Sequence, residues 1–305
     1  MNAPTKIGVF ALGLVAAFGA AVGIGSAVGP IGAAGAASEH DAAPDGHSDT
    51  DASSGDVGGQ GADSFPGGLM VSEQGYTLAV SQDDLPAGEA VSVGFRVLGP
   101  DGEPITEYDE THDKDLHLIV VRRDLSGFQH VHPELSDDGT WNTDVALTAG
   151  EWRMFADFAP AGHGDAIILG ADVSVAGGYQ PQTLPPAAAT DDVDGYVVTL
   201  DGELIPGRES ELTLSVSRDG QPVTDLQPYL AAYGHLVVLR DGDLAYLHVH
   251  PAGQPDDGVT EPGPGITFYA TVPSVGEYRL FLDFQHDGVV RTAEFTALAE
   301  GGHGG

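Results

Sequence analysis

Residues 116–133 read LHLIVVRRDLSGFQHVHP, and residues 234–251 read GHLVVLRDGDLAYLHVHP. Both stretches have an apolar run, a polar turn and a His-x-His-Pro ending. Around them other blocks recur in the same order: GYTLAV (75–80) with GYVVTL (195–200), LPAGEAVSVGFRV (85–97) with LIPGRESELTLSV (204–216), DGEPIT (101–106) with DGQPVT (219–224), and GEWRMFADF (150–158) with GEYRLFLDF (276–284). This conserved order indicates that one domain is present twice.

The pattern inside each copy predicts β-strands. Val91, Val93, Phe95 and Val97 alternate with polar or small residues, which is typical of a strand with one buried face. The chain contains 44 Gly and 20 Pro, and no amphipathic helix pattern stands out in either copy. We therefore expect an all-β fold of two tandem antiparallel sandwich domains, immunoglobulin-like or cupredoxin-like.

Composition divides the rest of the chain. Residues 1–30 carry Lys6 and then an uncharged apolar run that is long enough to span a bilayer, so they predict a transmembrane anchor or a signal peptide. The sandwich domains are predicted at 69–176 and 195–298. An acidic spacer rich in Gly, Ala, Ser and Asp (31–68), a Pro-rich linker (177–194) and a Gly-rich tail (299–305) complete the chain. Either leader predicts export, with the protein anchored in the cell membrane facing outside, or secreted after cleavage.

Charge and cysteine content exclude several classes of function. The chain has 11 basic and 46 acidic residues, a formal net charge of −35, so it should repel nucleic acids. It has no cysteine, which excludes disulfides, thiolate metal sites and thiol nucleophiles. Three methionines are too few for a methionine-rich Cu(I) site.

Histidines in the second copy predict a metal site on a hairpin. With a two-residue turn at Asp241-Gly242, His235 would face His248, and His250 would project from the same side. Directly opposed Cβ atoms lie about 5 Å apart and diagonal ones about 7–8 Å apart. Imidazoles on those positions can reach one ion with bonds of about 2.0–2.1 Å. Neutral imidazole suits Cu(II) or Zn(II), which are the cofactors we expect.

The first copy keeps the same spacing at His117, His130 and His132. Its turn lacks an Asp-Gly pair, so the register stays open. A two-residue loop would pair His117 with His130, and a four-residue loop would pair His117 with His132. Either loop keeps the three rings on one face, whereas an odd loop or a bulge would separate them.

Other residues are weaker candidates for the same chemistry. His163 and His286 follow the recurring Asp-Phe blocks and are either fourth ligands or loop residues. Asp157 and Asp283 are interpreted as carboxylates that orient a ligand ring, or as partners of strand-end hydrogen bonds. His112 has no match in the second copy and is predicted to be solvated.

The stretch at 116–133, with DGTW at 138–141 and GEWRMFADFAP at 150–160, resembles a group of exported bacterial β-sandwich proteins. They are described as YtkA-like or as heavy-metal-binding secreted proteins. The resemblance covers most of the first copy. The second copy is a diverged version that reads Tyr233-Gly234-His235 where the first has Asp-Lys-x-Leu-His. The resemblance implies a location in the cell envelope and a link to the handling of copper or another metal.

Three functions compete on this sequence. The first is a metal-binding protein with one three-histidine site per domain. The second is a structural or interaction protein whose histidines pack or form hydrogen bonds. The third is a zinc enzyme with an open fourth ligand position. No paired general base, Ser–His–Asp order or Gly-x-Ser-x-Gly motif supports catalysis, so we expect no enzyme. The predicted partners are a metal ion and, through residues 1–30, the membrane. The sequence names no protein partner.

Overall fold

The computed structural model describes residues 65–247 and 249–301. These described residues belong to one compact unit. The predicted anchor or signal segment at 1–30 and nearly all of the predicted spacer lie outside the described residues. The part of the chain that is described contains no helix with the length and apolar character needed to cross a membrane.

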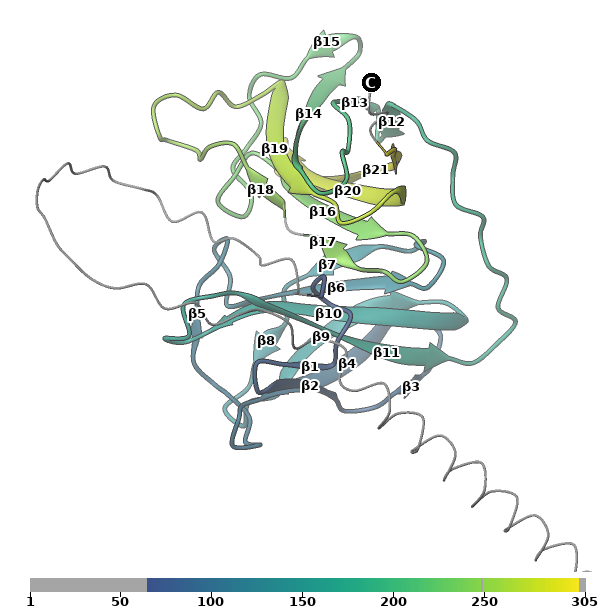
Figure 1. Cartoon of the computed structure of the whole chain (residues 1–305), viewed down its shortest axis with the longest axis vertical. Coiled ribbons are helices and arrows are strands. Elements are labelled where there is room, and N and C mark those ends of the chain that lie inside the picture. The colour runs from purple at the N-terminus through teal and green to yellow at the C-terminus, as the bar shows by residue number, and fades with distance from the viewer. Residues whose placement is uncertain (1–64, 248, 302–305) are drawn as a thin grey trace, which may run out of the picture. The chain divides into compact units, whose positions relative to one another are not determined.

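The first repeat is a sandwich of two sheets (Figure 1). Its strands are β1 Ser72–Glu73, β2 Tyr76–Val80, β3 Asp84–Leu85, β4 Gly88–Leu98, β5 Tyr108–Asp109, β6 Leu116–Arg122, β7 Gln129–Val131, β8 Glu134–Leu135, β9 Trp141–Leu147, β10 Gly150–Pro160 and β11 Ile167–Val175. One sheet has the order β1-β2-β4-β9-β8. The other has the order β3-β11-β10-β6-β7, with β5 added beside β10. All pairs are antiparallel except β3 with β11.

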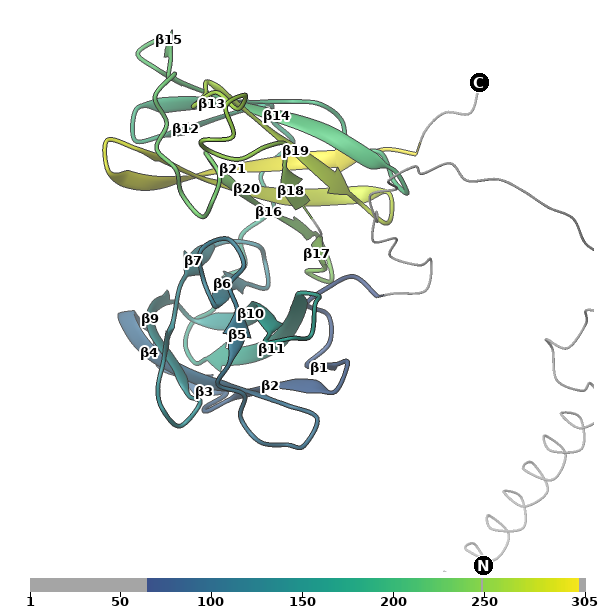
Figure 2. The same ribbon diagram turned by 90° about the vertical axis from the view of Figure 1, so that its left-hand side faces the viewer.

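The second repeat is built in the same way, as the turned view in Figure 2 shows. Its strands are β12 Thr190–Val193, β13 Tyr196–Asp201, β14 Glu209–Arg218, β15 Gln221–Pro222, β16 His235–Arg240, β17 Tyr246–Leu247, β18 Val249–Pro251, β19 Gly265–Thr271, β20 Gly276–His286 and β21 Val289–Ala299. The sheets have the orders β12-β13-β14-β19-β18, with β15 on β14, and β17-β16-β20-β21. The expectation of an all-β fold with two tandem sandwich domains is confirmed.

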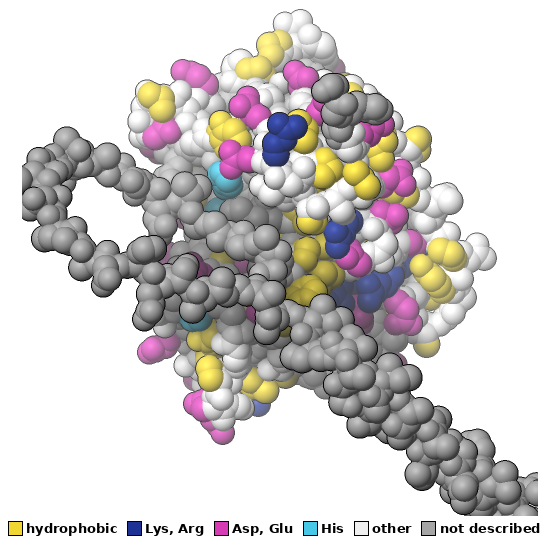
Figure 3. Space-filling view, in the orientation of Figure 1, with side chains coloured by type: hydrophobic (Ala, Val, Ile, Leu, Met, Phe, Trp, Pro, Cys, Tyr) yellow, Lys and Arg dark blue, Asp and Glu magenta, His cyan; other side chains and the backbone are white. Residues whose placement is uncertain are grey.

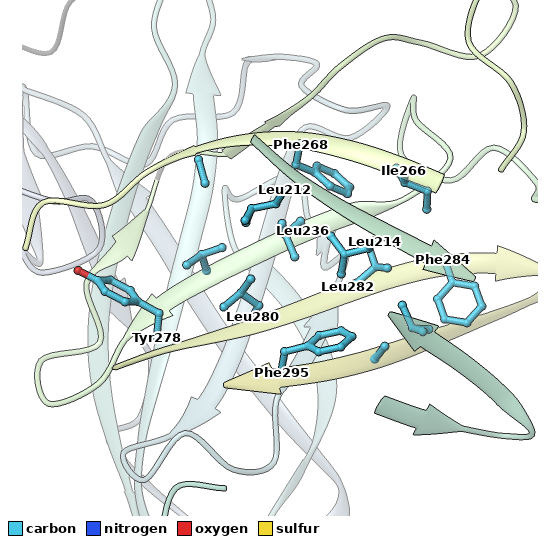
Figure 4. Packing of buried hydrophobic residues seen from close by; sticks show 14 of the residues in the cluster. Leu212, Leu214, Leu236, Ile266, Phe268, Tyr278, Leu280, Leu282, Phe284 and Phe295 are labelled. Carbon is cyan, nitrogen blue, oxygen red and sulfur yellow. The ribbon is translucent and has the colours of Figure 1, made fainter. Parts of the chain in front are cut away.

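Alternating apolar residues fill the core of each sandwich. In β4 the side chains of Val91, Val93, Phe95 and Val97 are buried, as the period of two predicts. In the second repeat, Leu212 and Leu214 of one sheet pack toward Leu280 and Leu282 of the other (Figure 4). This packing gives each sheet one face in the core of its own repeat and one outer face.

Strand β6 is buried along its whole length, which one sandwich cannot explain. Leu118 and its even-numbered neighbours belong to the core of the first repeat. Odd-numbered residues of β6 and of β16 form a further apolar cluster that joins the two repeats. We call this the inter-repeat cluster: Ile119, Val121, Leu125, Phe155, Val237, Leu239, Leu244, Tyr246 and Phe281. The outer faces of β6 and β16 therefore pack against apolar residues and not against water. His117 and His235 lie on these faces.

Candidate metal centre

The hairpin of the first repeat brings its three histidines to one face. Strands β6 and β7 pair Ile119 with His130 and Leu118 with Val131. Continuing this register places His132 opposite His117, which is the four-residue-loop alternative. Because side chains alternate along a strand, the three rings share the face of Ile119, the face that joins the repeats.

His117 lies at the centre of the group. Its side chain is only 1% exposed. Its Nδ1 is 3.0 Å from Nε2 of His130 and 3.2 Å from Nε2 of His132. Three imidazole nitrogens therefore converge on one point inside the protein.

Hydrogen bonds on the other side of two of the rings, His117 and His130, fix which of their nitrogens lack a proton. His117 Nε2 is 2.9 Å from the carbonyl oxygen of Thr111, and a carbonyl only accepts, so Nε2 is the protonated nitrogen. His130 Nδ1 lies 2.7 Å from Oδ2 of Asp283 and donates to that carboxylate. In the neutral rings, His117 Nδ1 and His130 Nε2 then face each other with lone pairs. That contact is favourable only when a positive group lies between them, either a proton on His130 or a metal ion bound by both.

The second repeat contributes His235, the first residue of β16. Ligand nitrogens of His117, His130 and His235 lie within 4.8 Å of one another. The ring of His235 is 4.7 Å from that of His130 and stacks on that of His117 at 5.6 Å. His112 also joins the group, with its ring 5.6 Å from that of His235. We call these residues the histidine cluster: His112, His117, His130, His132 and His235.

The predicted hairpin site of the second repeat is wrong in its register. A two-residue turn would have paired Leu239 with Leu244, whereas the structure pairs Leu239 with Tyr246. The chain then passes into the other sheet, where His250 of β18 pairs with Tyr269 of β19. His250 therefore lies on a different sheet from His235. His248 lies outside the described residues. What the structure shows is one group of histidines between the repeats, not two equivalent hairpins.

Carboxylates from both repeats surround the cluster. Asp283 of β20 is opposite His235, yet it bonds to His130 of the other repeat. Its second oxygen accepts a hydrogen bond of 2.6 Å from Thr292 Oγ1. Asp157 of β10 is opposite His117. Burial raises the pKa of Asp157 to about 6, although the charge of His130 pulls it the other way.

Four rings of the cluster favour the neutral form. Burial, followed by repulsion from His130, lowers the pKa of His117 to about 3. Burial and the charges of His130 and Lys114 lower the pKa of His132 to about 4. Burial also lowers the pKa of His235 well below its usual value, and that of His112 in the same direction. Unprotonated rings at neutral pH are the form that binds a metal ion.

The remaining candidates make contacts elsewhere. His163 Nε2 lies 2.9 Å from Gln74 Oε1, and the ring packs on Tyr76. His286 bonds to the hydroxyl of Tyr196 at 2.7 Å and to Asp225 at 3.1 Å. Both rings thus have partners outside the histidine cluster.

Sequence reasoning missed part of the cluster. His112 is exposed, as expected, but its ring also lies beside those of His117 and His235, which was not expected. The matching turn of the second copy, Tyr229 to Ala232, carries Leu230 at the position of His112, so the comparison of repeats gave no signal for this histidine. Tyr229, whose ring is 6.4 Å from that of His132, also comes from a loop.

We expect Asp283→Asn to weaken binding of a metal ion at the cluster. The amide oxygen is uncharged and a weaker acceptor, so His130 Nδ1–H loses the carboxylate partner that orients this ring. Loss of such a partner typically costs about 10–100-fold in affinity. Titration of the variant with Zn(II) measures the effect. Thr292→Val, which removes only the outer bond to Asp283, should have a smaller effect, and equal affinity in wild type and Asp283→Asn would contradict the assignment.

Comparison with curated proteins and solved structures gives only distant matches. None of the curated proteins matches this sequence. Matching solved structures include FdeC, an Escherichia coli adhesin (16% identity, TM-score 0.24, covering 75% of this chain and 65% of that one). They also include a mutant of Salmonella alpha-2-macroglobulin (15%, 0.25, 76% and 15%) and InvD of Yersinia pseudotuberculosis (12%, 0.24, 76% and 59%). The chain spans less than two thirds of the length of each of these proteins, and TM-scores this low carry no argument about function.

A family model gives a clearer result. The model described as "Domain of unknown function (DUF8832)" matches residues 71–175 and again residues 191–301, which together make up more than half of the chain. The two matches fall on the two sandwich repeats. The chain therefore belongs to this family and carries its domain twice.

Proposed function

We propose that this protein binds one Cu(II) or Zn(II) ion per chain at the histidine cluster. The observation that carries the proposal is the convergence on His117 Nδ1, a nitrogen without a proton, of the Nε2 atoms of His130 and His132 at 3.0 and 3.2 Å. A metal ion satisfies all three nitrogens at once, whereas one proton can serve only one pair.

The surroundings of the rings support ligation. A liganding histidine usually donates its other N–H to a carboxylate or a backbone carbonyl. His130 does so to Asp283, and His117 does so to Thr111. These bonds fix the tautomers that leave His117 Nδ1 and His130 Nε2 free.

The donor set points to a class of metal. The cluster offers imidazole nitrogen, and the chain has no thiolate to offer. Nitrogen donors suit Zn(II) and Cu(II), whereas Ca(II) and Mg(II) prefer oxygen ligands. Acidic side chains are spread over the face shown in Figure 3, without one dominant patch. Together with the net charge of −35, they would attract cations loosely and raise their concentration near the protein.

The cellular role that we propose is metal handling outside the membrane, by binding and not by catalysis. The charge pattern of residues 1–30 supports export, and the resemblance to the YtkA-like group supports a link to metals in the envelope. Buffering or delivery of the ion fits a site that is enclosed by protein.

A structural role is the second candidate, and one contact favours it. His130 of the first repeat and Asp283 of the second form a pair whose side chains are only 2% and 3% exposed. If His130 is protonated, this ion pair and its bond to His117 hold the repeats together without a metal. The protein would then be a tandem immunoglobulin-like envelope protein.

Calorimetric titration of the full chain separates the two candidates. We expect one equivalent of Zn(II) or Cu(II) to bind. His130→Ala should lower the affinity by more than the roughly 100-fold that marks the upper end for an outer partner. His163→Ala, which changes a histidine bonded to Gln74, should bind as the wild type does. Absence of binding to the wild type would overturn the metal proposal and leave the structural role.

A further inference from the structure

We infer that the bound ion ties the two repeats together, because the second repeat supplies one of its ligands. This inference rests on the proposed function and adds a consequence to it: metal binding controls how firmly the repeats hold each other. The ligand is His235, and Asp283 of the same repeat orients His130 of the first repeat.

The first observation is an unsatisfied nitrogen. His235 Nδ1 is buried and makes no hydrogen bond to any described residue. Buried polar atoms in proteins nearly always have a partner, so one without it calls for an explanation. One ring nitrogen of His235 lies within 4.8 Å of ligand nitrogens of His117 and His130, so the three rings are close enough to share an ion.

The second observation is that the first repeat cannot complete its own site. The acceptor that orients His130 is Asp283, which is 153 residues away in the chain and belongs to the other repeat. Thr292 Oγ1 donates to this carboxylate and holds it in place. A first repeat alone would therefore keep His117, His130 and His132 but lose the group that fixes the tautomer of His130.

The third observation is the position of the cluster beside apolar contacts between the repeats. His117 and His235 each lie two residues before a member of the inter-repeat cluster, Ile119 and Val237. Stacking of Phe128 on Phe281, with ring centroids 4.0 Å apart, adds to the same interface. An ion held from both sides would link β6 and β16 at one end of this interface and oppose its opening.

Hydrogen exchange of the full chain with and without Zn(II) tests the inference. A ligand that binds only the closed state lowers the population of the open state in proportion to its concentration over Kd, about 100-fold at 100 times Kd. We expect backbone amides of both β6 and β16 to exchange more slowly by up to this factor when Zn(II) is present.

Variants distinguish the inference from the proposed function. His235→Ala and His235→Gln should bind Zn(II) at least about 10-fold more weakly and lose the added protection of β16. His250→Ala, on the other sheet, is the matched control and should retain both. Binding and β16 protection that are unchanged in both His235 variants would overturn the inference while the proposed function stands. Failure of the wild type to take up Zn(II) would overturn both.

Discussion

Tight binding of Cu(II) and Zn(II) should be lost when His117 is replaced by alanine. His117 Nδ1 is the atom on which the nitrogens of His130 and His132 converge. Removing it leaves the other rings without the common point that defines the site. We expect a loss of affinity well above about 100-fold, because even an outer partner costs about 10–100-fold.

A matched change on the same strand controls for damage to the fold. Leu118→Met lies on the opposite face of β6, in the core of the first repeat, where Leu118 is fully buried. A swap of similar volume usually costs less than about 1.5 kcal/mol of folding stability. Leu118→Met should bind the metal as the wild type does. Equal affinities for the wild type and His117→Ala would show that the metal binds elsewhere.

The metal-free protein should become less stable as the pH falls from about 7 to about 4.5. In the folded state the pKa of His117 is about 3 and that of His132 about 4. In the unfolded chain a histidine has a pKa of about 6.5, so the unfolded state takes up these protons first. The stability that these neutral histidines contribute is therefore fully present above about pH 6.5. It is lost as the pH falls toward the pKa values of the folded state. His117 alone contributes a slope of about 1.4 kcal/mol per pH unit, and the more exposed His132 contributes less.

Asp157 works in the opposite direction over part of this range. Its folded pKa of about 6 lies above the unfolded value of 3.8, so the folded state is the one that binds its proton between these pH values. This proton uptake offsets the destabilisation that about one histidine causes. His235 and His112 add to the destabilisation, because burial lowers their pKa too.

Chemical denaturation of chelator-treated protein at a series of pH values measures the balance. We expect the free energy of unfolding to fall between pH 6.5 and 4.5, with a shallower slope in His117→Ala. A free energy that stays level or rises on acidification would contradict the burial of neutral histidines.

Much of the fold could be predicted from the sequence because it depends on local patterns. The alternation in β4 and the order of the repeated blocks indicated two sandwiches. The run from Leu116 to Val121 contains five apolar residues in six, which is typical of a strand buried on both faces. That signal was present, but it does not tell which partner covers the second face, since the inter-repeat cluster joins residues more than a hundred positions apart.

The site was predicted in part. His117, His130 and His132 come together because an even loop keeps them on one face, which spacing alone could show. The contribution of the second repeat could not be predicted from the Asp241-Gly242 turn. Arg240 N bonds to the carbonyl of Ala245 and Leu244 adopts a positive φ of 62°, so the loop is longer than the dipeptide suggests. The change of sheet after β17 then carries His250 away from His235.

X-ray absorption of the full chain loaded with one equivalent of Zn(II) tests most directly whether imidazoles of the histidine cluster bind the ion. The account predicts a shell of nitrogen ligands at about 2.0–2.1 Å with the scattering pattern of at least three imidazole rings. A shell made mainly of carboxylate oxygens would place the ion on the acidic surface and contradict the account.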